Sequence, residues 1–192
     1  MAASIFRKGQ YNTVDALLDA FHGSAAEAEF DKYFGCFFNE ESRFLGTDET
    51  ENWTAREFMS YAALPFRNGK REGRPAWKYT MREGTRKYTF VENNTICSFD
   101  ELLDSTMLYG GCRGSGVAVK DGQSNSWFLV QYHLSMPVPN DIALEVTRLT
   151  GEHNNLKQAS TKSDSAADEL LAMDEQVETA KSKSKSKGKK KK

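Results

Sequence analysis

A histidine in the last predicted strand is the first candidate for chemistry in this 192-residue chain. Residues 127–135 read WFLVQYHLS. Alternation along a strand puts His133 and Gln131 on one face, and Tyr132 on the other. A neutral imidazole can take or give a proton near pH 7, so His133 fits a general acid or base. A hydrogen-bonded structural histidine is the other interpretation, because buried polar groups are usually satisfied.

Two adjacent carboxylates, Asp100 and Glu101, interrupt the otherwise apolar strand pattern ICSFDELLDS. Neighbours on a strand point to opposite faces, so one of the two must face the packed side of the sheet. Burial raises the pKa of a carboxylate, and a nearby cation lowers it. Arg113 in the next predicted strand is the expected partner for either. Such a pair is either a structural ion pair or part of a catalytic site.

Other polar motifs in the chain give weaker indications of a functional site. The glycine-rich run GGCRGSG at 110–116 lacks the Lys-Ser/Thr ending and the strand-to-helix context of a phosphate loop, so we reject that interpretation. Its glycines are expected to relieve crowding where the sheet bends. Asp48 in the GTD turn is expected to cap that turn locally. His22 and His153 lie at a helix end and in a linker, without companions.

The three cysteines, Cys36, Cys97 and Cys112, form no CxxC pair. This spacing argues against a disulfide framework and against a zinc site. No motif for an organic cofactor is present, so no cofactor or metal is expected. The start MAASIFRKGQ has no apolar signal region, and no stretch approaches a membrane span. The sequence predicts a soluble intracellular protein with reduced thiols.

Helices are predicted in the first third of the chain. Residues 13–22 place apolar side chains at helical spacing after Thr13, a suitable N-cap. Residues 26–38 repeat that pattern. A third helix begins at Thr54, where Thr54 and Glu57 have capping-box spacing, and Pro65 is expected to end it.

Strands are predicted from residue 76 onward, over 76–92, 95–105, 108–122 and 126–139. Gly84 marks a bend or bulge in the first of them. Helices followed by a meander of strands predict an α+β fold, with helices on one face of a curved antiparallel sheet.

The composition predicts where the folded body ends. The last aromatic residue is Tyr132, and aromatic side chains dominate core burial. We therefore expect a flexible N-terminus at 1–10, one folded domain over 11–140, a short helix or linker over 141–159, and a disordered tail over 160–192.

Positive charge is concentrated at the C-terminal end. The twelve residues from Lys181 to Lys192 hold eight of the 26 basic residues, which leaves 18 basic against 27 acidic residues and a net charge of −9 for the rest. We therefore expect no nucleic-acid binding by the folded domain. The lysine-rich tail could contact a nuclear import receptor, RNA or an anionic membrane, or act only as a solubilising tail. A cytoplasmic location is predicted, or a nuclear one through this tail.

Four segments in order resemble a known family. They are FDKYFGCFFNEESRFLGTDETENWTAREF, SFDELLDS, RGSGVAV and WFLVQYHLSMPVPN. Together they resemble SnoaL-like domains of the nuclear-transport-factor-2-like superfamily, over roughly residues 10–140. The resemblance implies a cone-shaped, strongly curved antiparallel sheet around an apolar pocket, with the three N-terminal helices packed on its concave side. It also implies a homodimer through the open sheet face.

The same resemblance implies a site. By the family's pattern we place His133 toward the pocket, lined also by Trp53, Phe58, Trp77 and Gln131. For the two tryptophans, packing in the core or at the rim is the alternative to contact with a ligand. The superfamily includes ketosteroid isomerases, polyketide cyclases, scytalone dehydratase and pure association domains, so membership does not settle function.

Two hypotheses follow from the sequence. The first is a small-ligand-binding or assembly module, homodimeric and without a reaction. The second is a cofactor-independent isomerase, dehydratase or hydrolase, acting on a small apolar substrate through His133 with Asp100 or Glu101. Whether His133 and a carboxylate face one open cavity distinguishes them.

Overall fold

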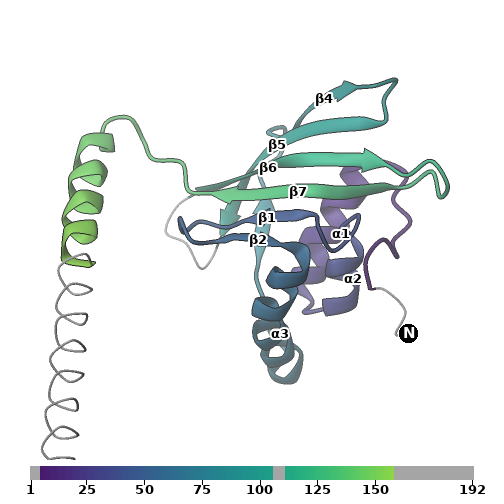
Figure 1. Cartoon of the computed structure of the whole chain (residues 1–192), viewed down its shortest axis with the longest axis horizontal. Helices are drawn as coiled ribbons and strands as arrows, with labels where there is room; N and C mark the ends of the chain where they lie inside the picture. Colours follow the sequence, from purple (N-terminus) through teal and green to yellow (C-terminus); the bar gives the residue numbers. More distant parts are fainter. Residues whose placement is uncertain (1–4, 106–110, 158–192) are drawn as a thin grey trace, which may run out of the picture. The chain divides into compact units, whose positions relative to one another are not determined.

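The computed structural model describes residues 5–105 and 111–157. The chain divides into two compact units, Met1–Pro137 and Val138–Lys192. The first unit holds the sheet and helices α1 to α3 (Figure 1). In the second, residues 143–157 are helical. The predicted tail at 160–192, with its lysine-rich end, lies outside the described residues.

Helix α1 (Val14–Ala26) is longer than its sequence pattern predicted. Thr13 caps its start as expected, because its side-chain oxygen accepts from the backbone N–H of Ala16 at 3.1 Å. The helix continues through Gly23 to Ala26 although glycine is a weak helix former. Burial of Ser24 and Ala25 beyond it favours this last turn.

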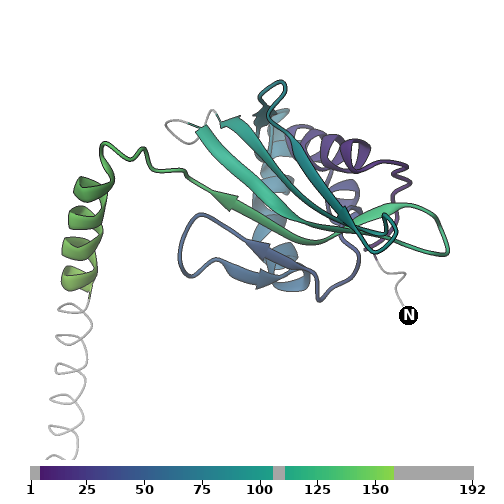
Figure 2. The same cartoon turned by 90° about the horizontal axis from the view of Figure 1, so that it is seen from above.

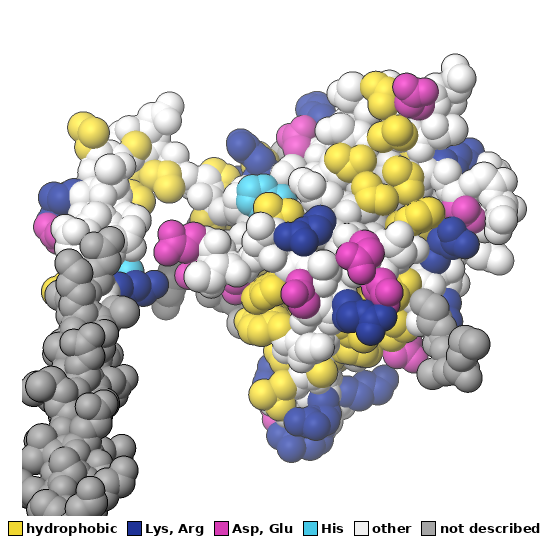
Figure 3. Space-filling model, in the orientation of Figure 1, with side chains coloured by type: hydrophobic (Ala, Val, Ile, Leu, Met, Phe, Trp, Pro, Cys, Tyr) yellow, Lys and Arg dark blue, Asp and Glu magenta, His cyan; other side chains and the backbone are white. Residues whose placement is uncertain are grey.

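Helix α3 (Ala55–Glu72) passes through Pro65, so the prediction that Pro65 ends it is wrong. Thr54 and Glu57 form the expected capping box at its start. Proline in a helix interior costs about 3 kcal/mol, but the turns beyond it bury Phe66 and Gly69 against the body. Basic side chains gather at the end of α3, where Lys70 and Arg71 face the negative end of the helix dipole (Figure 3).

Within the described residues the sheet has seven strands. Their bounds are β1 (Arg43–Leu45), β2 (Asn52–Thr54), β3 (Tyr79–Met81), β4 (Lys87–Val91), β5 (Ile96–Ser105), β6 (Gly111–Lys120) and β7 (Trp127–Ser135). The order is β2-β1-β7-β6-β5-β3, and β4 also pairs with β5. The pairing is antiparallel except between β1 and β7, which are parallel. The sheet is therefore mostly, and not purely, antiparallel.

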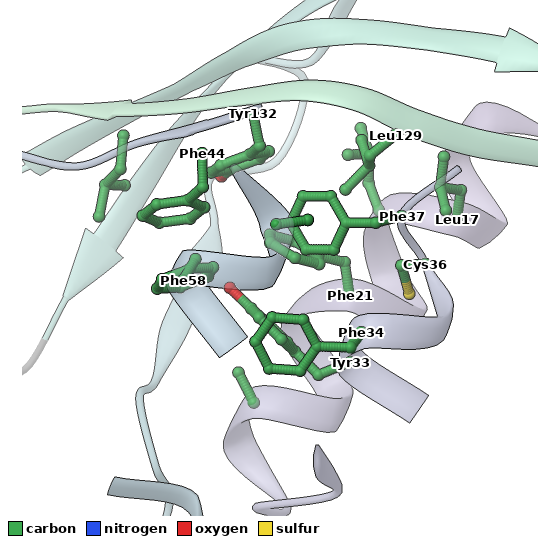
Figure 4. Close-up of a cluster of buried hydrophobic side chains, with 14 of the residues drawn as sticks. Leu17, Phe21, Tyr33, Phe34, Cys36, Phe37, Phe44, Phe58, Leu129 and Tyr132 are labelled. Carbon is green, nitrogen blue, oxygen red and sulfur yellow. The ribbon is translucent and has the colours of Figure 1, made fainter. Parts of the chain in front are cut away.

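The sheet curves around the helices, as Figure 2 shows from above. Helices α1, α2 (Phe30–Gly35) and α3 lie on its concave side (Figure 1). Aromatic side chains from both layers meet there: Phe44 and Tyr132 come from the sheet, and Phe21, Tyr33 and Phe58 from the helices (Figure 4). The predicted α+β cone with three helices on the concave side is confirmed.

Two segments outside these elements also have defined surroundings. A flexible N-terminus was predicted over 1–10. Its described part, residues 5–10, lies against the body: Ile5 and Phe6 pack on the core, and the Arg7 N–H donates to the Phe37 carbonyl at 2.9 Å. In the helix at 143–157, Leu144 and Leu149 are exposed. No helix among the described residues is long and apolar enough to span a membrane.

Candidate functional site

A cavity of about 210 Å³ lies between the helices and the concave face of the sheet. Nine of its fifteen lining residues are aromatic, so its wall is mostly flat apolar surface. The aromatic residues are Phe21, Tyr33, Phe44, Trp53, Phe58, Tyr61, Trp77, Tyr79 and Tyr132; the others are His22, Ala25, Gly46, Thr47, Glu51 and Leu134.

The exposure of these side chains distinguishes a floor from a mouth. Tyr132 is 2% exposed and His22 8%, whereas Tyr61 is 52% exposed. Thr47, in the loop between β1 and β2, is also exposed. The cavity therefore opens beside Tyr61 and the 46–51 loop, and it ends near His22 and Tyr132.

Several rings in the wall are nearly parallel. Phe58 stacks on Phe44 at 3.7 Å and 10°, and lies at 8° to Trp53 and 16° to Trp77. Tyr61 continues the series toward the mouth, at 4.8 Å and 27° from Trp53. Parallel rings present their faces in one direction, so this wall suits a flat partner.

Three tyrosine hydroxyls from different elements lack a partner here. Tyr33 on α2, Tyr79 on β3 and Tyr132 on β7 make no side-chain hydrogen bond within the described part of the chain, and the Tyr132 oxygen is fully buried. In Figure 4 the Tyr33 hydroxyl points toward Phe58. Burial raises the pKa of Tyr33 and Tyr132 well above the usual value, and that of Tyr79 to about 12. All three are therefore neutral donors at pH 7.

At the floor, His22 is held by a carboxylate behind it. Its Nε2 lies 2.6 Å from Oε1 of Glu101, on β5. Glu101 is 0% exposed and does not line the cavity, whereas His22 does. Glu101 thus fixes the orientation of a histidine that faces the cavity, as carboxylates do for catalytic histidines.

Arg86 completes this arrangement on the other side of Glu101. Its Nε donates to Oε2 of Glu101 at 2.8 Å, and its NH1 to Asp15 at 3.0 Å and Asp19 at 2.9 Å. Tyr88 donates to the same Asp15 oxygen. The Arg86 side chain is only 6% exposed, and its NH2 has no partner. The network ties α1 to β4 and β5.

The register of the sheet explains why Arg86 meets Glu101. Met81 on β3 pairs with Leu103, and Lys87 on β4 pairs with Asp100. Between these pairs the chain leaves the sheet in a turn that contains Gly84 at φ 72°. Arg86 re-enters one position before Lys87, and therefore opposite Glu101 and on its face.

The electrostatic balance at Glu101 favours the charged form. Burial raises the pKa of its carboxyl, but the hydrogen bond from His22 and the charge of Arg86 outweigh burial, so the pKa lies below its usual range. Burial also disfavours the Arg86 cation, but Glu101, Asp15 and Asp19 hold its pKa above the ordinary value. The pair is ionised at neutral pH.

Gly114 on β6 leaves the space that this floor requires. A Cβ atom there would lie 2.2 Å from the Tyr132 hydroxyl and 3.1 Å from Oε1 of Glu101. Both contacts are shorter than van der Waals distance, so a side chain at this position would displace the floor. Within the run GGCRGSG, Gly114 is thus explained by the close approach of these two side chains.

Comparison with known proteins supports one family. The model of the SnoaL-like domain family matches residues 14–139, about two thirds of the chain. The chain belongs to the SnoaL-like domain family. The resemblance seen in the sequence is thereby confirmed. No curated protein matches the sequence.

A solved structure agrees on the fold of this SnoaL-like domain. An NTF2-like protein of unknown function from Pseudomonas putida KT2440 matches with a TM-score of 0.50 and 8% identity, over 66% of this chain and 86% of that one. An NTF-2 like protein of unknown function from Shewanella oneidensis MR-1 matches with 0.49 and 13%, over 64% and 96%. At such identities the likeness concerns the fold alone.

His133 of this SnoaL-like domain lies outside the cavity. Tyr132 and Leu134 line the cavity, and alternation therefore directs His133 to the opposite, outer face of the sheet. Its cross-strand neighbours are Ser115 and Leu45. The predicted orientation of His133 toward the pocket is wrong. On β7 the aromatic side chain of Tyr132 faces the cavity, so its neighbour His133 faces the opposite way.

Asp100 and Arg113 lie on that outer face as well. Asp100 is exposed and pairs with Lys87 and Ser115. Arg113 is exposed and pairs with Leu102, so it cannot reach Glu101 through the sheet. Arg113 was expected to be the partner of either Asp100 or Glu101; for Glu101 this is wrong, because Arg86 has that position.

The expected lining residues divide in the same way. Trp53, Phe58 and Trp77 lie in the cavity wall. Gln131 is exposed on the outer face, opposite Arg43 and Val117, so its predicted place in the pocket is wrong. The cause is the same one-residue parity that misplaced His133.

Sequence reasoning missed His22 and Arg86, although each left a signal. His22 lies four residues after Leu18 and three before Ala25, within the buried stripe of α1, so it was wrong to regard it as a residue without companions. Arg86 shares strand parity with Tyr88 and Phe90, two aromatic residues. Both signals are polar residues at apolar positions.

Metal chemistry has no support among the described residues. No group of three or more His, Cys, Asp or Glu side chains there could hold a metal ion. Cys36, Cys97 and Cys112 are free and buried, and burial raises the pKa of the Cys36 thiol to about 12. The cavity offers flat apolar surface, neutral hydroxyl donors, one anchored histidine and the Glu51 carboxylate.

Proposed function

We propose that the cone cavity binds a small, flat, mostly apolar molecule that carries one hydrogen-bond acceptor. The observation that carries the proposal is an aromatic cavity lined by Tyr33, Tyr79 and Tyr132, in which the buried Tyr132 hydroxyl has no partner among the described residues. Buried tyrosine hydroxyls normally have a partner. An acceptor on a bound molecule would supply one.

The size of the cavity limits the ligand. Sites for drug-sized molecules measure about 300–1,000 Å³, and this cavity measures about 210 Å³. It therefore suits a molecule of one or two rings. The nearly parallel rings of Phe44, Phe58 and Trp77 favour a flat shape.

A pair of probes of one shape tests this proposal. Acetophenone carries a carbonyl acceptor, and α-methylstyrene has the same outline without it. We expect both to bind, measured by ligand-observed NMR, and acetophenone to bind more tightly. Tyr33→Phe should weaken the binding of acetophenone by about 1 kcal/mol, the net value of one hydrogen bond. It should leave the affinity for α-methylstyrene unchanged.

Tyr61→Phe is the matched control, because its hydroxyl lies at the exposed mouth. It should leave the affinity for both probes unchanged. Failure of both probes to bind, with the variants folded, would contradict the proposal of a ligand pocket.

The His22–Glu101 pair supports a second candidate, a cofactor-independent acid–base enzyme. A histidine that faces a cavity and is oriented by an ionised carboxylate can move a proton to or from a bound molecule. His22, and not the predicted His133, would be the base. Glu101 would position it, since Glu101 does not line the cavity.

Hydrogen exchange tests this candidate without a known substrate. α-Tetralone in D₂O exchanges the protons next to its carbonyl, and an acid–base site would accelerate the exchange, followed by NMR. His22→Gln should abolish the acceleration, and His133→Gln on the outer face should not. Exchange at the buffer rate with the unmodified protein would favour the binding module for this probe.

A further inference from the structure

We propose that the ligand of this cavity carries a positive charge, as an organic ammonium group bound at the mouth by Glu51 and the aromatic faces beside it. This inference rests on the proposed function and specifies the chemical class of the ligand.

Glu51 is fixed in the cavity wall by its own loop. The loop closes where the Gly46 N–H donates to the Glu51 carbonyl at 2.8 Å and the Glu51 N–H to the Asp48 carbonyl at 3.0 Å. The Asp48 N–H donates to Oε2 of Glu51 at 3.2 Å. A Cβ atom at Gly46 would lie 2.0 Å from the same oxygen. The Glu51 carboxylate thus lies beside Gly46, the residue of this loop that has no side chain.

This carboxylate has no cationic partner in the described part of the protein. Every ion pair there involves other acidic residues, from the Arg86 network at the floor to surface pairs such as Arg82–Asp104. No lysine or arginine from residues 5–105 or 111–157 lines the cavity. Among the described lining residues Glu51 is the one carboxylate, and no lysine or arginine there balances it, which disfavours an anionic ligand.

The neighbouring aromatic rings also attract a cation. The face of an aromatic ring is negative and attracts cations, most strongly for tryptophan. Trp53, Tyr61 and Trp77 line the cavity together with Glu51. Trp53 and Tyr61 stack at 4.8 Å near the mouth, where Tyr61 is exposed. An ammonium group beside this stack would meet an aromatic ring face and a carboxylate.

Three isosteric probes separate charge from shape. Phenyltrimethylammonium is a cation, tert-butylbenzene has the same outline without charge, and phenylphosphonate is an anion of similar length. Binding to the full chain is measured by ligand-observed NMR. We expect the cation to bind about 5- to 30-fold more tightly than tert-butylbenzene, a range typical of one ring face plus a partly exposed charge.

Glu51→Gln removes the charge but keeps an oxygen for the Asp48 N–H. It should reduce the affinity for the cation by about 5-fold or more and leave tert-butylbenzene unchanged. Glu49→Gln is the matched control, because Glu49 is exposed in the same loop and does not line the cavity. It should change neither affinity.

The outcomes distinguish this inference from the one it rests on. Equal binding of the cation and tert-butylbenzene, preferred binding of phenylphosphonate, or equal losses in Glu51→Gln and Glu49→Gln would each overturn the cationic ligand and leave the pocket standing. If neither the cation nor the neutral probes bind, both the cationic ligand and the proposed ligand pocket are contradicted.

Discussion

The hydrogen bond between His22 Nε2 and Glu101 Oε1, 2.6 Å long, joins α1 to β5 across 79 positions of sequence. It holds one face of the helix against the concave side of the sheet. It also sets the orientation of the histidine in the cavity, so one contact contributes to both fold and site. Arg86 donates to the other oxygen of Glu101, and this contact offsets the free-energy cost of burying the carboxylate in the core.

Removing either member of the Glu101–Arg86 pair should destabilise the domain strongly. Glu101→Gln and Arg86→Met each leave a buried group without its partner, at a cost of about 3 kcal/mol in the free energy of unfolding. The double variant should lose less than the sum of the two. Urea unfolding measures all three.

Arg113→Met is the control for that cycle, because Arg113 is exposed on the outer face. It should change stability by less than about 0.5 kcal/mol. Additive losses for Glu101 and Arg86 would show that the two side chains are not coupled.

The stability of the domain should depend on the charge of Glu101 at acid pH. The pKa of Glu101 is lower in the folded state, so its contribution is complete above the unfolded value of about 4.3 and is lost as pH falls through the folded value. Between pH 6 and pH 3 the unmodified protein should therefore lose more stability than Glu101→Gln.

Asp104→Asn is the matched comparison for this pH effect. Arg82 also lowers the pKa of Asp104, but Asp104 is exposed and the pair is screened by water. Asp104→Asn should leave the acid loss nearly as in the unmodified protein. If Asp104→Asn and Glu101→Gln reduced the loss of stability between pH 6 and pH 3 equally, a special role for Glu101 would be contradicted.

Tyr132→Phe should stabilise the protein without ligand. The Tyr132 hydroxyl is buried and has no hydrogen-bond partner, and such a group costs about 1–3 kcal/mol. Its removal should raise the free energy of unfolding by about 1 kcal/mol, measured by urea or thermal unfolding. Tyr88→Phe should act in the opposite direction, because Tyr88 donates to Asp15. A loss of stability in Tyr132→Phe would mean that its hydroxyl is satisfied.

The homodimer remains a proposal, and the outer face of the sheet is the surface that would form it. Leu45, Leu102 and Val117 are partly exposed there, and a two-fold interface is a common way to cover such a face. We expect a dimer mass by light scattering at micromolar concentration. Val117→Lys should give a monomer, and Leu64→Lys on the exposed side of α3 should not. A monomeric unmodified protein would contradict the proposal.

Much of the fold was determined by the sequence itself. The caps at Thr13 and Thr54 are local interactions between residues three apart, so their spacing predicts them directly. The predicted strands over 95–105, 108–122 and 126–139 contain β5, β6 and β7, and the ordered motifs identify the family. Local rules were misleading at Pro65, where burial of later turns outweighs the cost of one lost hydrogen bond.

The site was decided only by the tertiary structure. Sequence showed that Asp100 and Glu101 face opposite ways and that His133 and Tyr132 do too, but it could not decide which member of each pair faces the cavity. That choice depends on the register between strands and on which face the helices cover. The partners of Glu101 lie 79 and 15 positions away. Such contacts are set by packing of the whole domain, which no local pattern encodes.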